Sequence, residues 1–495
     1  MISTSVDEYQ NDTEIQSLHS LAYVNRAKKF IEKEGYDEAE DILLQALELP
    51  QKDALVYKYL GLVYDKQKNF EKAVEVYQSS AEIGPLDKNV WQKLGFALIA
   101  VEKYVEAEKS FENSNRVSAG NTDTYTGWGM SLMKQGEYEQ AREKFSTAVN
   151  INKYNFSAIF LSAVMDINLE EYDKAESKLI FLANVTPNET NTFEYAHLKF
   201  LKGDYETALR YANISLEHNS CMLPSYLLIA KIHSLNFNKD EAISSFETAE
   251  ARELTSFALY FEWGLALERF HMYSEAKEKF LLAMDFDNKN PVLLANLALM
   301  NALLDSFDDT YIYSQMVSEI APDNKILKLI NGIIDYEKDE FSSAVRLLKD
   351  GMSGDFLDAI NSYYLAKCYE KMNDEVRVKD YYEAALQKNP VYLNAYLAYA
   401  KFMIDNEDYA EAKRKLRKAM RISPENTVVL NALFFVGYKL EKENSCEFNI
   451  KELFLLAEKI KNIDIEKFLY DNELAELIGV LEPKSEHLSV LYDEN

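Results

Sequence analysis

The chain has 495 residues and few of those that interrupt helices, form disulfides or bind metals. It contains 15 glycines, 9 prolines and 3 cysteines. The cysteines are far apart and form no CxxC pair, so we expect neither a disulfide framework nor a zinc site, and a reducing compartment fits. The 6 histidines form no HExxH motif and no cluster with cysteine. We therefore expect no metal site and no cofactor.

Positive charge is also scarce. The 54 lysines and arginines stand against 82 aspartates and glutamates, which gives a formal net charge of -28. This balance argues against nucleic acid as a partner, because neutralising phosphates requires clustered Lys and Arg. It equally disfavours an anionic membrane surface. The acidic excess fits either a basic partner or simply a well-solvated surface.

Long apolar runs and phosphate-binding loops are missing as well. No run approaches the 18 apolar residues that suggest a membrane span. The first 14 residues lack the basic start and the apolar centre of a signal peptide. Neither GxxxxGK[ST] nor GxGxxG occurs. Paired carboxylates are spread along the whole chain and give no catalytic signal. We therefore expect a soluble, cytoplasmic protein that is not an enzyme.

What the chain does contain is a pattern of two helices, clearest between residues 57 and 85. The first helix is predicted from residues spaced i, i+3, i+4 and i+7, namely Tyr57, Leu60, Gly61 and Tyr64. The pattern breaks at Asn69 and Phe70, and a second face follows, made of Ala73, Tyr77 and Ser80. Pro85 ends this helix. Such a unit cannot bury its own apolar faces, so it needs copies on either side.

The copies follow at intervals of 34 residues, with a single interval of 33. The small residue of the first helix is always Ala or Gly: Ala27, Gly61, Gly95, Gly129, Ala163, Ala196, Ala230, Gly264, Ala298, Gly332, Ala366 and Ala400. The small residue of the second helix lies twelve positions later: Ala39, Ala73, Ala107, Ala141, Ala175, Ala208, Ala242, Ala276, Thr310, Ala344, Val378 and Ala412. Four positions further on, a larger residue is usual, and only Ala212 and Ser314 depart from this. The sequence thus predicts twelve repeats.

This pattern resembles the tetratricopeptide repeat (TPR) family, whose unit is a helix–turn–helix of 34 residues. The resemblance covers Leu21 to Pro424. It implies an all-α fold, a right-handed TPR superhelix (α-solenoid) of antiparallel helix pairs, with a concave inner surface that holds a partner. The matching positions are packing positions, so they specify the fold much more than the function.

The predicted organisation has four parts. Residues 1–16 form a disordered acidic tail, and residues 17–424 form the array of twelve repeats. Residues 425–482 form a degenerate thirteenth repeat and a C-terminal capping helix, and residues 483–495 form a second tail. Repeats five, six and nine carry polar residues at sites that are usually apolar or small: Asp166, Thr192, Lys199, Asn301, Thr310 and Ser314.

The candidate partner-binding residues follow from the family resemblance. In TPR proteins, the partner usually meets the residues three before and one after the small residue of each first helix. In this sequence these positions are mostly apolar from Met130 to Ile333. Six of them are predicted to line a continuous groove: Met130, Phe160, Val164, Phe193, Phe261 and Leu265. The alternative is that the inner face is self-packed core.

The groove would bind a protein or peptide partner through an apolar or amphipathic segment. Lysines at the corresponding positions near both ends would favour an acidic flank on that segment: Lys28, Lys58, Lys367 and Lys401. The predicted function is therefore a non-catalytic scaffold or adaptor. The alternative function is a structural subunit of a multiprotein assembly or a homo-oligomer.

Overall fold

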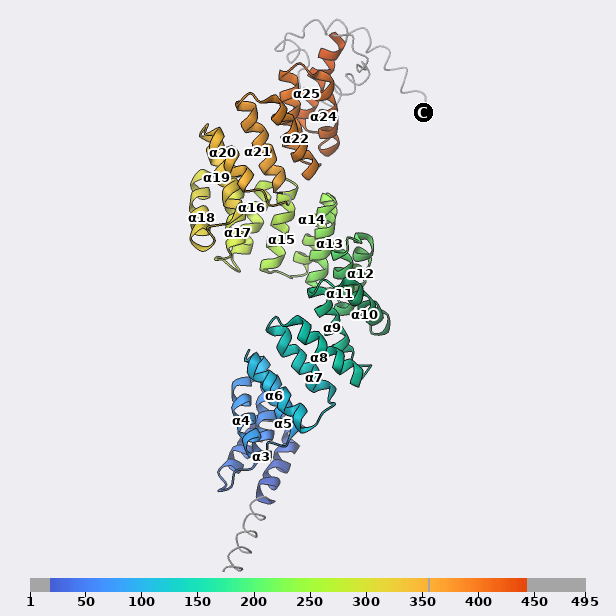
Figure 1. Ribbon diagram of the computed structural model, residues 1–495, viewed down its shortest axis with the longest axis vertical. Coiled ribbons are helices and arrows are strands. Elements are labelled where there is room, and N and C mark those ends of the chain that lie inside the picture. The colour runs from blue at the N-terminus through green and yellow to red at the C-terminus, as the bar shows by residue number, and fades with distance from the viewer. Residues whose placement is uncertain (1–17, 355–356, 443–495) are drawn as a thin grey trace, which may run out of the picture. The chain divides into compact units, whose positions relative to one another are not determined.

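The computed structural model describes residues 18–354 and 357–442 (Figure 1). These residues form helices joined by short turns, and the described ranges contain no strand. The all-α prediction is confirmed. The chain divides into two compact units, Met1–Leu228 and Ile229–Asn495, and their boundary falls within one helix, α13 (Leu223–Leu235). The predicted capping helix and both tails lie outside the described residues.

Unit 1 consists of helix pairs in which each helix packs on its neighbours in the chain. Its helices are a first one over residues 18–31, then α2 (Tyr36–Leu47), α3 (Ala54–Lys66), α4 (Phe70–Ile83), α5 (Lys88–Ala100), α6 (Tyr104–Val117), α7 (Thr122–Lys134), α8 (Tyr138–Ile151), α9 (Phe156–Asn168), α10 (Tyr172–Val185), α11 (Glu189–Leu201) and α12 (Tyr205–His218). Odd-numbered helices from α3 on are the first helices of their repeats.

Unit 2 continues the same pairing. After α13, its helices are α14 (Lys239–Ala251), α15 (Phe257–Arg269), α16 (Tyr273–Met284), α17 (Pro291–Leu303), α18 (Phe307–Ile320), α19 (Lys325–Glu337), α20 (Phe341–Asp350), α21 (Asp358–Lys371), α22 (Glu375–Lys388), α23 (Leu393–Asp405), α24 (Tyr409–Ile422) and α25 (Thr427–Lys442). Helix α25 falls within the predicted thirteenth repeat.

The small residue of the first helix leaves space for the large side chain that the second helix of the same repeat usually carries. A Cβ atom added to Gly61 would lie 2.5 Å from the ring of Tyr77, and one added to Gly129 would lie 2.6 Å from the ring of Phe145. Real Cβ atoms do not approach a ring so closely, so the glycine makes room for the aromatic side chain. The buried rings Tyr77 and Phe145 then fill the space between the two helices.

Each turn within a helix pair contains one residue with a positive φ, five positions before the small residue of the second helix: Glu34, Lys68, Glu102, Gly136, Glu170, Gly203, Phe237, His271, Asp305, Asp339, Asn373 and Glu407. In the second repeat, the amide of Asn69 then donates to the carbonyl of Tyr64 over 2.9 Å. This is the hydrogen-bond pattern of a helix that ends in a left-handed residue. Only two of the twelve residues are glycines, so most of these turns hold a strained backbone.

Two of the polar residues at predicted apolar positions, Asp166 and Asn301, are paired in the structure. Asp166 of repeat five is fully buried, and its carboxylate lies 2.5 Å from the Lys178 ammonium and 3.4 Å from the Arg142 guanidinium. Asn301 of repeat nine accepts a hydrogen bond from Lys277 over 2.6 Å and donates one to the carbonyl of Leu297. These repeats replace an apolar contact by a hydrogen-bonded one, which satisfies the buried polar group.

Repeat nine has a different arrangement from the others. Helix α19 packs against α17 more than against the intervening α18. As a result α17 is buried on all sides from Leu293 to Ala302, whereas α18 buries only Thr310 and Val317. The second helix of this repeat therefore packs less closely on the first helix that follows it than α16, α20, α22 and α24 do.

Candidate protein-binding cavity

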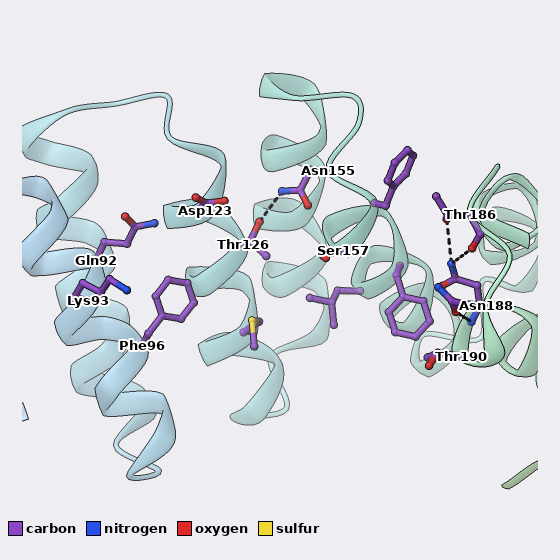
Figure 2. A pocket seen from close by; sticks show the side chains of 15 residues that line it. Gln92, Lys93, Phe96, Asp123, Thr126, Asn155, Ser157, Thr186, Asn188 and Thr190 are labelled. Atoms are coloured by element: carbon purple, nitrogen blue, oxygen red, sulfur yellow. Dashed lines mark hydrogen bonds between the residues drawn. The ribbon is translucent and has the colours of Figure 1, made fainter. Parts of the chain in front are cut away.

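A cavity of about 910 Å³ opens on unit 1, and the first helices of repeats three to six line it (Figure 2). Helices α5, α7, α9 and α11 contribute one or two turns each, mostly near their N-terminal ends. The lining residues are Gln92, Lys93, Phe96, Asp123, Thr126, Met130, Asn155, Phe156, Ser157, Phe160, Leu161, Thr186, Asn188, Thr190 and Asn191. Uncharged polar groups and aromatic rings dominate this lining.

The amides and hydroxyls of the cavity are held in place by one another. The Asn155 side chain donates to the Thr122 hydroxyl over 2.8 Å and to the Thr126 hydroxyl over 3.1 Å, and it accepts from the amide of Ala158 as the N-cap of α9. On the other side, Asn191 donates to the Thr186 carbonyl over 2.8 Å. These groups are therefore preorganised, and a ligand does not have to order them.

Three phenylalanines supply the apolar part of the cavity. Phe96 comes from α5, Phe156 and Phe160 both come from α9, and each ring is half-buried. The Phe96 ring packs edge-on against the buried ring of Phe111 at 5.2 Å between centroids, which fixes its orientation. The exposed parts of these rings face the same space as the polar groups, so the cavity can hold both apolar side chains and a peptide backbone.

The six residues predicted to line a groove are all half-buried. The cavity brings two of them together, Met130 and Phe160. Val164 packs on the core cluster around Phe145, and Phe193 stacks on His197 with ring centroids 6.1 Å apart.

The other two predicted residues belong to unit 2. Phe261 stacks on Phe257 at 5.2 Å and tilts against Phe280 at 5.8 Å, and Leu265 lies one turn further along α15. Neither lines the cavity in unit 1. The proposed continuity of the groove over all six residues stays a prediction.

Sequence reasoning missed the polar residues and Phe156, because it considered only the positions three before and one after the small residue. Phe156 and Asn155 lie seven and eight positions before Ala163, in the first turn of α9 and at its cap. The signal was present in the sequence as Asn or Asp at the start of successive first helices, at Asn121, Asn155 and Asn188. Capping alone accounts for such residues, so it did not mark a site.

The corresponding inner positions of repeats nine and ten are core. Ala295, Leu299, Leu329 and Ile333 are all less than 2% exposed. For these four positions, self-packing is the correct explanation of the apolar pattern. The same kind of residue thus lines a cavity in unit 1 and fills the interior in unit 2.

Unit 2 also contains a contact between two repeats that are far apart in sequence. His271 lies in the turn of repeat eight, and its ring stacks on Tyr392 of repeat twelve with centroids 3.8 Å apart. The Asn389 side chain donates to the carbonyl of Arg269 over 3.0 Å and lies 2.9 Å from His271 Nε2. We call His271, Tyr273, Asn389 and Tyr392 the clasp.

The clasp fixes the protonation state of His271. Since Asn389 uses its amide nitrogen for the Arg269 carbonyl and its oxygen to accept from the amide of Val391, it cannot turn around. It therefore presents a donor to His271 Nε2, which must accept, and Nδ1 is left to donate to the Tyr273 hydroxyl over 2.6 Å. This is a neutral imidazole. Burial lowers the pKa of His271 to about 3, in the same direction.

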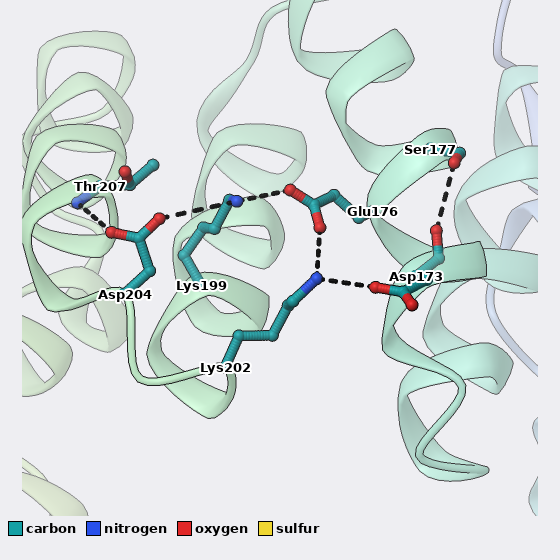
Figure 3. Close-up of polar contacts among 7 residues, drawn as sticks. All are labelled: Asp173, Glu176, Ser177, Lys199, Lys202, Asp204 and Thr207. Atoms are coloured by element: carbon teal, nitrogen blue, oxygen red, sulfur yellow. Dashed lines mark hydrogen bonds and ion pairs between the residues drawn. The ribbon is translucent and has the colours of Figure 1, made fainter.

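Charged residues form a structural network between repeats five and six (Figure 3). Lys202 lies 2.6 Å from Glu176 and 2.8 Å from Asp173, and Lys199 pairs with Glu176 and with Asp204. Hydrogen bonds from the two lysines lower the pKa of Glu176. The network joins α10 to α11, which explains the lysine at a predicted core position of repeat six.

Three of the four lysines that were predicted to attract an acidic flank already have partners. Lys58 lies 2.6 Å from Asp87, Lys28 lies over the ring of Tyr59, and Lys367 lies over the rings of Tyr336 and two neighbouring tyrosines. Burial lowers the pKa of Lys367. The acidic flank stays a prediction.

The described ranges contain no group of three or more His, Cys, Asp or Glu side chains that could hold a metal ion. None of their helices combines the length and the apolar character that a bilayer crossing requires.

Part of the chain is similar to one known family of repeat proteins. Residues 24–88 match the family described as tetratricopeptide repeat. No curated protein matches the chain. Among solved structures, a tetratricopeptide repeat protein from Parabacteroides merdae is 17% identical, with a TM-score of 0.44, and the match covers 50% of this chain and 98% of that one.

Two more solved structures cover a larger share of the chain. Yeast Tom70 is 18% identical, with a TM-score of 0.34, and the match covers 90% of this chain and 100% of that one. A chain of the APC/C hetero-tetramer Cut9–Hcn1 is 11% identical, with a TM-score of 0.39, and the match covers 83% and 95%. All three TM-scores are below 0.5, so these alignments do not establish a common arrangement of the repeats.

The family assignment therefore depends on the match and on the repeat geometry. The match covers the first two helix pairs, and the same pair, with the same small residue, large residue and left-handed turn, recurs through both units. Repeats of this family are protein-interaction scaffolds in general. Residues 24–88 therefore match the tetratricopeptide repeat family, and the helix pairs that follow in the described ranges are built in the same way.

Proposed function

We propose that the protein is a non-catalytic scaffold that binds an extended segment of a partner protein in the unit 1 cavity. The observation that supports this most directly is the composition of the cavity. Fixed amides and hydroxyls stand beside three phenylalanine rings, in a space of about 910 Å³. Such a space accommodates a few residues of peptide, with main-chain groups on the polar side and an apolar side chain among the rings.

The cavity also suggests what the segment looks like. Its two charged lining residues, Lys93 and Asp123, have opposite signs and are both exposed. The lining therefore favours neither a strongly acidic nor a strongly basic segment. We propose that the bound part is uncharged, and that an aliphatic or aromatic side chain enters between Phe96, Phe156 and Phe160.

Peptide display with the full chain as bait tests this proposal. We expect the selected peptides to share an apolar side chain in an uncharged context, and to protect amides in the first turns of α7, α9 and α11 from hydrogen exchange. Phe160→Ser should weaken their binding at least about tenfold, since burying a Phe side chain contributes roughly 1.5–3 kcal/mol.

The matched control is Phe286→Ser, which removes an exposed phenylalanine of unit 2 that does not line the cavity. It should leave peptide binding unchanged. The melting temperature of both variants shows whether the fold is intact. If the selected peptides bind Phe160→Ser and the parent equally well, the cavity is not the binding site.

A further inference from the structure

Helix α18 of repeat nine carries an apolar face that its own repeat does not cover. Tyr311 is 63% exposed, Ile312 54%, Met316 38% and Ile320 53%. Ile312, Met316 and Ile320 are four residues apart, so they form one stripe along the helix. We call these four residues the repeat-nine patch. It is independent of the cavity in unit 1.

The patch is exposed because the next repeat packs elsewhere. In five other second helices, the residue after the small position makes a polar contact with the first helix of the next repeat. Glu40 accepts from Tyr64 in this way over 3.0 Å, and Lys277 donates to Asn301 over 2.6 Å. Tyr311 holds this position in repeat nine, but its hydroxyl accepts from Gln315 of its own helix. Since α19 packs mainly on α17, it leaves this side of α18 open.

Within the patch, Ile312 is not a by-product of the repeat pattern. Ile312 lies two positions after the small residue of its second helix. The residue at this position is polar or charged in every other repeat: Asp41, Glu75, Lys109, Glu143, Ser177, Arg210, Ser244, Glu278, Arg346, Asp380 and Arg414. An isoleucine at this position is therefore peculiar to repeat nine. Exposed apolar residues that gather on one face are typical of an interaction surface.

The charges around the patch have one sign. Residues 290–324 contain no Lys, Arg or His, and they contain five acidic residues. These are Asp305, Asp308, Asp309, Glu319 and Asp323, and all five are exposed. Asp309 forms an ion pair with Lys277 at 3.6 Å, and Asp305 lies near enough to Lys367 for their charges to interact. A partner that covers the patch must therefore approach a negative rim.

We propose that the repeat-nine patch docks an amphipathic helix of another protein, with an apolar stripe against Ile312 and Met316 and with Lys or Arg beside the stripe. Side chains spaced four apart form a ridge that fits the groove of a second helix. The basic residues of the partner pair with the acidic rim. A second copy of this chain is a poorer occupant, because it would bring the same acidic rim to the contact.

The test uses the full-length protein and a synthetic helical peptide of about 18 residues, roughly five helical turns. Leucines at i, i+3 and i+4 spacing form one face, and lysines occupy the other positions. A second peptide has glutamates in place of the lysines. We expect the Leu/Lys peptide to protect the amides of α18 from hydrogen exchange, and to bind at least about tenfold more tightly than the Leu/Glu peptide.

The double variant Ile312→Ser with Met316→Ser should weaken binding of the Leu/Lys peptide at least about tenfold. Ile83→Ser with Ile151→Ser is the matched control, because these isoleucines are also exposed on second helices, at α4 and α8. It should bind like the parent. The whole chain is acidic, so it could attract the Leu/Lys peptide non-specifically. If the Ile312/Met316 variant binds this peptide as tightly as the parent does, the binding is non-specific and the proposal is overturned.

Two other results would also overturn it. One is that the Leu/Lys peptide protects amides outside α18, and not those of α18, from hydrogen exchange. The other is a concentration-dependent increase of mass in the parent that disappears in the Ile312/Met316 variant, because a second copy would then be the occupant. Equal binding of the Leu/Lys and Leu/Glu peptides would refute the role of the acidic rim, and with it the basic partner.

Discussion

The clasp should make unit 2 less stable as the pH falls, through one residue, His271. The structure holds His271 as a neutral imidazole, between the Asn389 amide and the Tyr273 hydroxyl, with its ring against Tyr392. An added proton at Nε2 would face the amide hydrogens of Asn389. Since Asn389 is fixed by Arg269 and Val391, protonation costs a hydrogen bond as well as the burial of a charge.

The magnitude follows from the pKa. The pKa of His271 is lowered from 6.5 to about 3 in the folded protein. Between these two values the unfolded chain binds a proton that the folded chain does not. The free energy of unfolding of unit 2 therefore decreases as the pH falls through this window, by about 1.4 kcal/mol per pH unit. The titration of His271 alone should lower the free energy of unfolding of unit 2 by about 2 kcal/mol between pH 6.5 and pH 5.

The tryptophans offer an assay that reports on unit 2 alone. Trp91 and Trp128 lie in unit 1 and Trp263 is buried in unit 2, so Trp91→Phe with Trp128→Phe leaves one reporter. Urea unfolding of this background at pH 7 and pH 5 should show the loss of stability. His271→Gln removes the titrating group, so it should reduce the pH dependence by about 2 kcal/mol.

The control is His218→Gln, which removes an exposed histidine from α12. It should leave the pH dependence of the Trp263 transition unchanged. If His271→Gln shows the same difference between pH 7 and pH 5 as its parent, the neutral, buried imidazole described here is incorrect.

Two predictions concern the repeat itself. Gly129→Ala places a Cβ 2.6 Å from the Phe145 ring, so it should destabilise unit 1 by about 1–3 kcal/mol in urea unfolding followed by circular dichroism; an unchanged midpoint would show that the ring moves aside freely. Glu102→Gly relieves a left-handed turn residue with φ of 60°, so it should stabilise unit 1 by roughly 0.5–1 kcal/mol in the same assay; a lower midpoint would mean that the Glu102 side chain is needed.

The helix pairs could be predicted because the forces that make them are local. The small residue and its large partner lie sixteen positions apart. Gly61 and Gly129 stand opposite Tyr77 and Phe145, whereas Ala163 stands opposite Leu179. A sequence therefore shows the packing within a pair directly. The fold class and the repeat boundaries follow from this alone.

The cavity and the clasp could not be predicted in the same way. Whether an inner position is open depends on what lies across from it, several repeats away. Met130 and Phe160 face a cavity, whereas Leu329 and Ile333 occupy the same positions in their repeats and are core. That difference is a sum of small rotations from one repeat to the next. No single residue of the sequence carries it.

The clasp has a consequence for how the two units unfold. In a repeat array whose contacts join only neighbours, each repeat can open separately, and the ends open first. His271 and Asn389, however, are 118 residues apart in sequence. Repeats eight to twelve therefore cannot separate one at a time without first breaking this contact. We expect unit 2 to unfold as a block, more slowly than a simple array, because its closing contact is non-local. Unit 1, whose inter-repeat hydrogen bonds join neighbouring repeats, can instead unfold gradually, one repeat after another.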